Sequence, residues 1–262
     1  VFSECKNLES LTVSEDNLNY SSQDGILYNK EKTEFVHVPK SIKGNISIPC
    51  SIIRIEESVF YERNNLNSIV IPNSVISIGR SAFYGCSSLN SIIIPNCVTT
   101  IECSAFQECN NLTSVYYNGT IDEWVQIEGN YYANPLHNGG GLYIDNELLR
   151  EAKITTATKI NAWAFHGYAN LRSVTISNSV TSIGENALYC CESLTNITIP
   201  DSVTFIGGGA FGSCYNLRQV DYVGTIDNWV QIKFGGSNAN PLSGALSMNG
   251  KLYIDNELLR EA

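Results

Sequence analysis

The stretch SLNSIIIPNCVTTIECSAFQECNNL, residues 88–112, decides the fold because close copies of it recur along the chain. Its Ala-Phe dipeptide, or a variant of it, recurs at an even spacing, at Phe60, Phe83 and Phe106 and again at Phe165, Leu188 and Phe211. A fixed period of about 20–50 residues is the signature of repeat architectures. No unit of this size can bury its apolar face alone, so we expect the units to stack as a solenoid.

Each unit predicts two extended stretches and a turn. The pattern Leu-x-x-Ile-x-Ile, as in Leu89, Ile92 and Ile94, predicts a short strand whose alternating apolar residues point inward. Ser-Val-x-x-Ile-Gly predicts a second extended stretch with Val75 and Ile78 inward, and Ala-Phe is expected on a tight helical or 3₁₀ turn. About seven coils carry the strand pattern, which starts at Leu8, Leu66, Leu89, Leu112, Leu171, Leu194 and Leu217.

A larger duplication, of residues 115–152 as 220–262, overlies the coils. VYYNGTIDEWVQI at the start of the first copy returns as VDYVGTIDNWVQI, and LYIDNELLREA at its end returns letter for letter. Because both ends of the sequence cut through repeats, we expect residues 1–262 to form a single solenoid segment of a longer protein. Insertions are expected near residues 14–45, 118–153 and 223–262.

The insertions carry local structural signals. Thr120-x-x-Glu123 resembles a capping box, which predicts a short helix carrying Trp124. Trp229 occupies the equivalent position in the second copy, and we interpret both indoles as core residues rather than as a ligand platform.

Two hairpins are also predicted from the turn residues. The stretch Leu142–Ala152 predicts a hairpin that turns at Asp145-Asn146. A second hairpin is expected from Asp24-Gly25 through Val38.

Two stretches carry the pattern IPxSVTxIGxxAFxxCxxL almost unchanged, at residues 71–89 and 199–217. Through them the chain resembles the BspA-like leucine-rich repeats of bacterial and protozoan surface proteins. The resemblance implies a right-handed leucine-rich-repeat solenoid, dominated by β-structure, with short helical or 3₁₀ turns and with hairpin and short-helix insertions. It also implies secretion or display at the cell surface, and attachment to an extracellular-matrix or cell-surface protein or glycan of a host or neighbouring cell. No catalytic residue and no cofactor come with it.

Composition excludes several classes of partner. The chain has 262 residues, of which 43% are hydrophobic, and its formal net charge is −10. Nucleic acids and anionic membranes are bound by clustered Lys and Arg, and the basic residues here are scattered. No apolar stretch approaches the ~18 residues that span a bilayer. We therefore expect no nucleic-acid partner and no membrane span in this segment.

Five of the nine cysteines fall three residues after the Phe or Leu of the turn, namely Cys5, Cys86, Cys109, Cys191 and Cys214. We interpret them as reduced thiols buried in the stack, because an odd number of cysteines fits poorly with a disulfide framework. Disulfides between neighbouring coils stay an alternative, since spacing alone does not exclude them. Cys97 takes a slot that Ser74 holds in the preceding coil, where a thiol or hydroxyl can serve backbone groups.

Catalytic and metal-binding patterns find no support in the residues. His37, His137 and His166 lie in different predicted elements, and no GxSxG, HExxH or phosphate-binding glycine loop occurs. The Asp and Glu residues form no calcium-loop pattern, and no CxxC pair begins a zinc site. We therefore expect no enzyme, with no catalytic, cofactor-binding or metal-binding residues.

The outward residues of three consecutive strands suggest a binding surface. Val70, Ile93 and Tyr116 each lie between the two inward residues of their strand and should stand side by side, each ~4.8 Å from the next. The small polar residues Ser91 and Ser114 flank them on the same strands. Because exposed apolar patches commonly mark contacts, we hypothesise that these five residues bind a partner. The alternative is that a neighbouring insertion covers them.

These features favour a cell-surface or secreted binding module that mediates adhesion. The alternative is a structural spacer that presents another domain and binds nothing itself, and uniformly polar outward positions would have favoured it. A hydrolase site in the loop at residues 131–141 is a remote third possibility, because no nucleophile and base are paired there.

Overall fold

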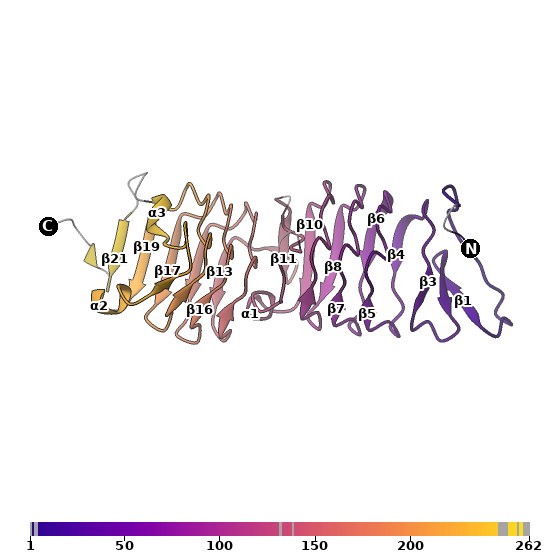
Figure 1. Cartoon of the computed structure of the whole chain (residues 1–262), viewed down its shortest axis with the longest axis horizontal. Coiled ribbons are helices and arrows are strands. Elements are labelled where there is room, and N and C mark those ends of the chain that lie inside the picture. Colours follow the sequence, from indigo (N-terminus) through magenta and orange to yellow (C-terminus); the bar gives the residue numbers. More distant parts are fainter. Residues whose placement is uncertain are drawn as a thin grey trace. The chain divides into compact units, whose positions relative to one another are not determined.

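The structure is a computed structural model that describes residue 2 and residues 5–130, 133–137, 139–245, 251–255 and 257–258. The chain divides into two compact units, residues 1–118 with 130–138 and residues 119–129 with 139–262. Each unit is a β-solenoid in which short strands of successive coils pair in parallel (Figure 1). The predicted solenoid is therefore confirmed.

Unit 1 contains two parallel strand rows and a hairpin sheet. The first row is β4 (Lys43–Ser47), β6 (Asn65–Val70), β8 (Ser91–Pro95) and β10 (Ser114–Asn118). The second row is β5 (Arg54–Ile55), β7 (Ser77–Ile78) and β9 (Thr100–Ile101). The antiparallel sheet is β1 (Tyr20–Gln23), β2 (Ile26–Asn29) and β3 (Phe35–His37). Here β2 and β3 form the hairpin predicted from Asp24-Gly25 through Val38, and β1 adds a strand before it.

Unit 2 repeats the two rows. The first is β13 (Glu151–Ile154), β15 (Ser173–Ile176), β17 (Asn196–Pro200), β19 (Gln219–Val223) and β21 (Lys251–Ile254), which β22 (Glu257–Leu258) joins antiparallel. The second is β14 (Lys159–Ile160), β16 (Ser182–Ile183), β18 (Phe205–Ile206) and β20 (Lys233–Phe234). The unit also holds the short helices α1 (Ile121–Trp124), α2 (Ile226–Trp229) and α3 (Leu242–Ala245) and the hairpin β11 (Gly141–Ile144) and β12 (Glu147–Leu148).

Alternating apolar residues place each coil against the next. Ile69, Ile92 and Val115 pair in register across β6, β8 and β10, and all three side chains are buried. Because successive strand residues point to opposite faces, the residues between them face outward. Residues at the same repeat position thus form a continuous inner column in the core.

The Ala-Phe segment is a tight turn, as predicted, but it is not a helix. Ser81 and Gly85 on either side of Phe83 have φ of 51° and 68°, which is the left-handed region. The N–H groups of Ser81, Phe83 and Gly85 donate to carbonyls of the next coil at 3.0, 2.9 and 2.9 Å. A helix would direct these donors along its own axis. The turns therefore form a third hydrogen-bond ladder between coils.

Aromatic rings stack beneath these turns in unit 1. The ring centroids of Phe60 and Phe83 lie 5.3 Å apart, and those of Phe83 and Phe106 lie 5.2 Å apart. Interplanar angles of 10° and 11° make both pairs parallel. In unit 2 the same turn position holds Phe165, Leu188 and Phe211, all buried.

Four of the five repeat-position cysteines are buried hydrogen-bond donors. The Sγ atoms of Cys86, Cys109, Cys191 and Cys214 donate to the carbonyl of the turn residue of the preceding coil at 3.0, 3.0, 3.1 and 3.0 Å, respectively. Burial raises the pKa of Cys86 and of Cys214 to about 12. No disulfide joins any of the nine cysteines, all of which lie in the described part of the chain.

Two cysteine predictions are wrong. Cys5 is exposed, not buried in the stack, because the described residues provide no earlier coil for its thiol to contact. Cys97 is also exposed, and its Sγ lies 3.7 Å from Asn96 Oδ1 rather than on a backbone carbonyl. By contrast, Ser74 Oγ donates to Ile52 O at 2.6 Å. A thiol is the weaker donor, so it gains less from that contact.

The predicted inserted helix is confirmed by its cap. Glu123 N donates to Thr120 Oγ1 at 3.3 Å, and Thr120 N donates to Glu123 Oε2 at 2.7 Å, which is a complete capping box. Trp124 is buried and its Nε1 donates to Ala164 O at 3.0 Å, and Trp229 is buried as well. Both indoles are therefore core residues.

The hairpin predicted over Leu142–Ala152 is shorter than expected. It turns at Asp145-Asn146 as predicted, with both residues at positive φ, but its second strand ends at Leu148. Glu151 and Ala152 instead begin β13, which pairs in parallel with β15.

No helix among the described residues is long and apolar enough to cross a membrane.

Candidate partner-binding face

The three hypothesised apolar residues form one row across unit 1. Val70 on β6 is the register partner of Ile93 on β8, and Ile93 is the register partner of Tyr116 on β10. We call Val70, Ile93 and Tyr116 the apolar strip. The row extends to Ser47 on β4, which is the register partner of Val70. The sequence analysis did not predict this residue, because the coil of β4 departs from the repeat sequence pattern.

The apolar strip is accessible on its outer side. Val70 is 42% exposed, whereas Ile93 and Tyr116 are half-buried. The β1–β2 hairpin reaches the edge of the row, where Ser47 N donates to Asp24 Oδ2 at 3.0 Å. It leaves Val70 exposed, so no insertion covers this residue of the apolar strip.

A row of small polar side chains runs beside the apolar strip. Ser68, Ser91 and Ser114 are register partners on β6, β8 and β10, and the two that belong to the hypothesised site, Ser91 and Ser114, are half-buried. Ser68 Oγ donates to Asn45 Oδ1 at 2.8 Å, which continues the row onto β4. Short hydroxyl side chains leave the larger apolar residues standing above the sheet. The arrangement suits an occupant with an apolar or aromatic surface and hydrogen-bonding groups at its edge.

The equivalent face of unit 2 has different chemistry. Its outward row consists of the register partners Lys153, Thr175, Thr198, Asp221 and Tyr253. All but Tyr253 are polar or charged, so the same strand position is apolar in one unit and largely polar in the other. The apolar strip is therefore a local property of unit 1 and not a requirement of the repeat.

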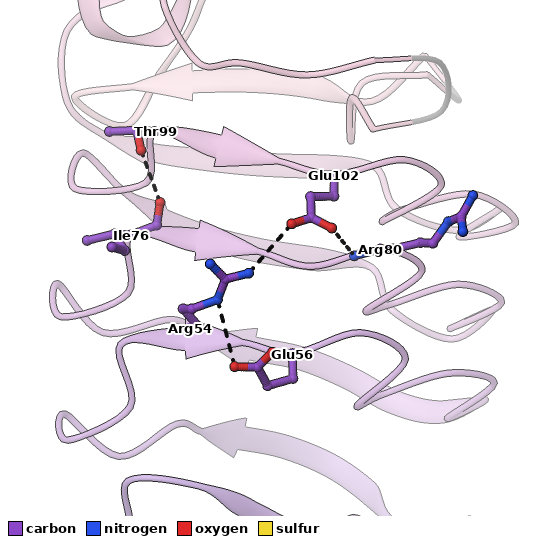
Figure 2. A network of polar contacts seen from close by, with 6 residues as sticks. All are labelled: Arg54, Glu56, Ile76, Arg80, Thr99 and Glu102. Atoms are coloured by element: carbon purple, nitrogen blue, oxygen red, sulfur yellow. Dashed lines mark hydrogen bonds and ion pairs between the residues drawn. The ribbon is translucent and has the colours of Figure 1, made fainter.

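The second strand row of unit 1 carries ion pairs instead (Figure 2). Arg54 lies 3.6 Å from Glu102 and 3.7 Å from Glu56, and Arg80 N donates to Glu102 Oε2 at 3.2 Å. The link from Arg54 to Glu102 spans the coil of β7, where Ser77 is only 7% exposed. This network joins three coils and places the Arg54 guanidinium between two carboxylates.

The three histidines belong to different segments of the chain. His37 ends β3, and burial, together with the nearby charge of Arg63, lowers its pKa. Burial also lowers the pKa of His137. His166 is buried in a turn with its ring stacked on Tyr189 at 5.3 Å. The loop considered for a hydrolase lies partly outside the described residues, and within them no group of three His, Cys, Asp or Glu side chains is placed to hold a metal.

Comparison with known proteins identifies the repeat. Residues 40–126 and 145–242 match the sequence model described as the BspA type leucine rich repeat region, in six copies. No curated protein matches the chain.

Solved structures give weak global similarity. A leucine-rich repeat protein from Eubacterium ventriosum is 23% identical over 82% of this chain and 48% of its own, with a TM-score of 0.44. The pneumococcal vaccine antigen PcpA is 19% identical over 94% of this chain and 50% of its own, also at 0.44. A leucine rich cell surface protein from Faecalibacterium prausnitzii is 19% identical over 84% and 99%, at 0.29. The chain spans about half the length of the first two, and scores of this size carry no argument about function.

Proposed function

Because the chain belongs to the BspA type leucine-rich repeat family, we propose that it is a binding module of a cell-surface or secreted protein. In this proposal it adheres to a protein or glycan of a host or neighbouring cell and carries out no chemical reaction. Membership of a family of surface proteins supports the extracellular location.

The observation that carries the proposal is the apolar strip. Val70, Ile93 and Tyr116 stand in register on neighbouring strands, and the equivalent row of unit 2 is largely polar. A folded chain gains nothing from an apolar residue that stays in water, so a local apolar row with Val70 42% exposed favours a contact. A spacer that binds nothing has no need of this difference between the units.

Tyr116 is the residue we expect to contribute most. Tyr is enriched among the residues that dominate binding energy, because it contributes a large contact area with few rotatable bonds. Truncating such a residue costs about 2 kcal/mol or more, which weakens binding by about thirtyfold. Ile93 is half-buried beside Tyr116 and Val70 stands at the other end of the strip.

The test is a binding screen followed by substitution. The protein is first screened against immobilised matrix proteins and a glycan array. The triple variant Val70→Ser, Ile93→Ser, Tyr116→Ser is then compared with a matched control, Thr175→Ala and Thr198→Ala, which alters the same strand row in unit 2. Thermal unfolding is measured for both variants, since only a folded variant informs on binding.

We expect the strip variant to lose binding by tenfold or more while the control keeps it. Unchanged affinity in a folded strip variant would remove the apolar strip from the site. Failure to bind any protein or glycan would instead support the spacer, because no surface of the chain would then be engaged.

A further inference from the structure

Two exposed isoleucines of unit 1 occupy a position where the other coils have threonine. This position comes immediately before each strand of the second row, and its side chain faces outward. It holds Ile53 before β5 and Ile76 before β7, which are 60% and 50% exposed. The coils of β9, β14, β16 and β18 carry a threonine there, namely Thr99, Thr158, Thr181 and Thr204.

The threonine at this position serves the stack. Thr99 Oγ1 donates to Ile76 O of the preceding coil at 3.3 Å (Figure 2). Thr181 Oγ1 and Thr204 Oγ1 make the same bond to the preceding coil at 3.4 Å each. Ile76 lies beside Ile53, since its N–H donates to Ile53 O at 3.0 Å, but its side chain offers no second donor to that carbonyl. The isoleucines thus give up a bond between coils and expose apolar surface, which favours a contact.

A groove of about 590 Å³ lies beside Ile53. Ligand pockets commonly have volumes of about 300–1,000 Å³, so the groove is large enough to hold several side chains. Ser51 Oγ donates to Lys32 O at 2.6 Å, and this bond ties the coil of β5 to the loop between β2 and β3. The lining includes Glu34 and Phe35 from the hairpin sheet and Ile53, Arg54 and Glu56 from the coil of β5.

The charges along the groove are mainly acidic. Glu34 is exposed and makes no ion pair within the described residues. Arg54, the basic residue of the lining, lies 3.7 Å from Glu56 and 3.6 Å from Glu102 and is therefore shared between two carboxylates. Carboxylates thus outnumber cations here, and the groove complements a basic side chain.

The groove also lies at a sheet edge. Within the described residues β5 is the edge strand of its sheet, whose order is β5-β7-β9. An edge strand presents N–H and C=O groups that can pair with an extended segment. Glycan hydroxyl groups would lose water against the aliphatic side chains without replacing those hydrogen bonds. The groove therefore favours an extended polypeptide over a glycan.

We propose that Ile53, Ile76 and the groove beside β5 bind an extended segment of a partner protein that carries aliphatic side chains and at least one Lys or Arg. The aliphatic side chains cover Ile53 and Ile76, and the basic side chain pairs with Glu34 or Glu56. The apolar strip lies on β6, β8 and β10, so this second site does not depend on the partner of the strip.

The test uses fluorescently labelled hexapeptides in which Val, Ile, Leu or Phe alternates with Lys. Two control peptides replace either Lys by Glu or the apolar residue by Ser. Fluorescence polarisation compares the original chain with Glu34→Gln and with the double variant Ile53→Thr, Ile76→Thr, which restores the residue of the other coils. The Val70→Ser, Ile93→Ser, Tyr116→Ser variant is the control for the apolar strip. Urea unfolding is measured for every variant.

We expect at least one apolar-Lys peptide to bind and both control peptides to bind at least about tenfold more weakly. The double Thr variant should lose about tenfold in affinity, because two aliphatic contacts are removed. Glu34→Gln should lose about threefold, as expected for an exposed ion pair. The apolar-strip variant should bind the peptide as the original chain does.

Four outcomes would overturn the proposal. The first is failure of all the apolar-Lys peptides to bind at about 1 mM. The second is equal affinity of the original chain and the double Thr variant. The third is a lower urea midpoint of the double Thr variant, because the isoleucines would then serve the sheet as a cross-strand pair. The fourth is loss of peptide binding in the apolar-strip variant, which would place the peptide on the apolar strip instead.

Discussion

Substituting Asp122 by Asn should destabilise unit 2 by about 1–2 kcal/mol at neutral pH. Asp122 Oδ1 accepts hydrogen bonds from the backbone N–H groups of Thr155, Thr156 and Ala157 at 2.8, 2.9 and 2.9 Å. The variant keeps one carbonyl oxygen for these three amides, so each bond changes from a charged to a neutral acceptor. Bonds to charged groups contribute about 1.5–3 kcal/mol and neutral ones about 1 kcal/mol, which gives a loss of at least about 1.5 kcal/mol for three bonds. Partial exposure of Asp122 to water reduces that figure.

The effect should depend on pH with a defined sign. Burial raises the pKa of Asp122, but the hydrogen bonds from Ala157, Thr156 and Thr155 outweigh it and hold the pKa below its ordinary value. A carboxyl with a lowered folded pKa contributes stability above the unfolded pKa of about 3.9 and loses it as the pH falls through the folded value. The difference between the original chain and Asp122→Asn should therefore be constant from pH 7 to about 5 and vanish in stronger acid.

Urea unfolding followed by tryptophan fluorescence at several pH values measures this difference. The matched control is Asp227→Asn, which alters the same residue of the second copy, where the carboxylate makes no hydrogen bond within the described residues. Equal effects of the two substitutions at pH 7 would refute the argument. A difference that did not shrink as the pH fell below about 3.9 would refute the assigned role of the charge.

Two further predictions concern the core. A thiol reagent should modify the native protein at the exposed cysteines Cys5, Cys50 and Cys97 and should reach Cys86, Cys109, Cys191 and Cys214 only after unfolding, because burial raises their pKa and the thiolate is the reactive form. Mass spectrometry locates the labels, and rapid native labelling of a buried site would contradict the burial. Phe83→Ala should cost about 3–5 kcal/mol in urea unfolding, whereas Phe83→Leu should cost markedly less, since Leu188 fills the same turn position. Equal losses would show that the slot needs an aromatic ring.

The repeat predicted the inner columns because burial follows directly from periodicity. Leu89, Ile92 and Ile94 recur at fixed spacing, and a period-2 apolar pattern has one inward face. The register of the apolar strip followed in the same way from the equal spacing of Val70, Ile93 and Tyr116 along the sequence. Local pairs such as Thr120 and Glu123 were also predictable, since both residues belong to one turn of the chain.

Features that depend on a neighbouring coil were not predictable from one unit. The turn around Phe83 is not a helix because its donors serve the next coil, and short-range propensity does not contain that information. The ion pair of Arg54 and Glu102 joins two different coils, and neither residue is part of the repeat sequence pattern. The burial of Cys86 and the exposure of Cys5 likewise depend on whether a coil lies on the far side.

The ladder of turns has a consequence for how such a gene can change. Ser58, Phe60 and Glu62 donate to Arg80, Ala82 and Tyr84, and every donor finds its acceptor at the same separation along the chain. Because those acceptors are backbone carbonyls, any coil offers them whatever its side chains. Unequal recombination that removes or adds a whole coil therefore yields a chain with all its ladders intact. Only the packing of the buried side chains, such as Phe83, would then need to be improved by later mutations.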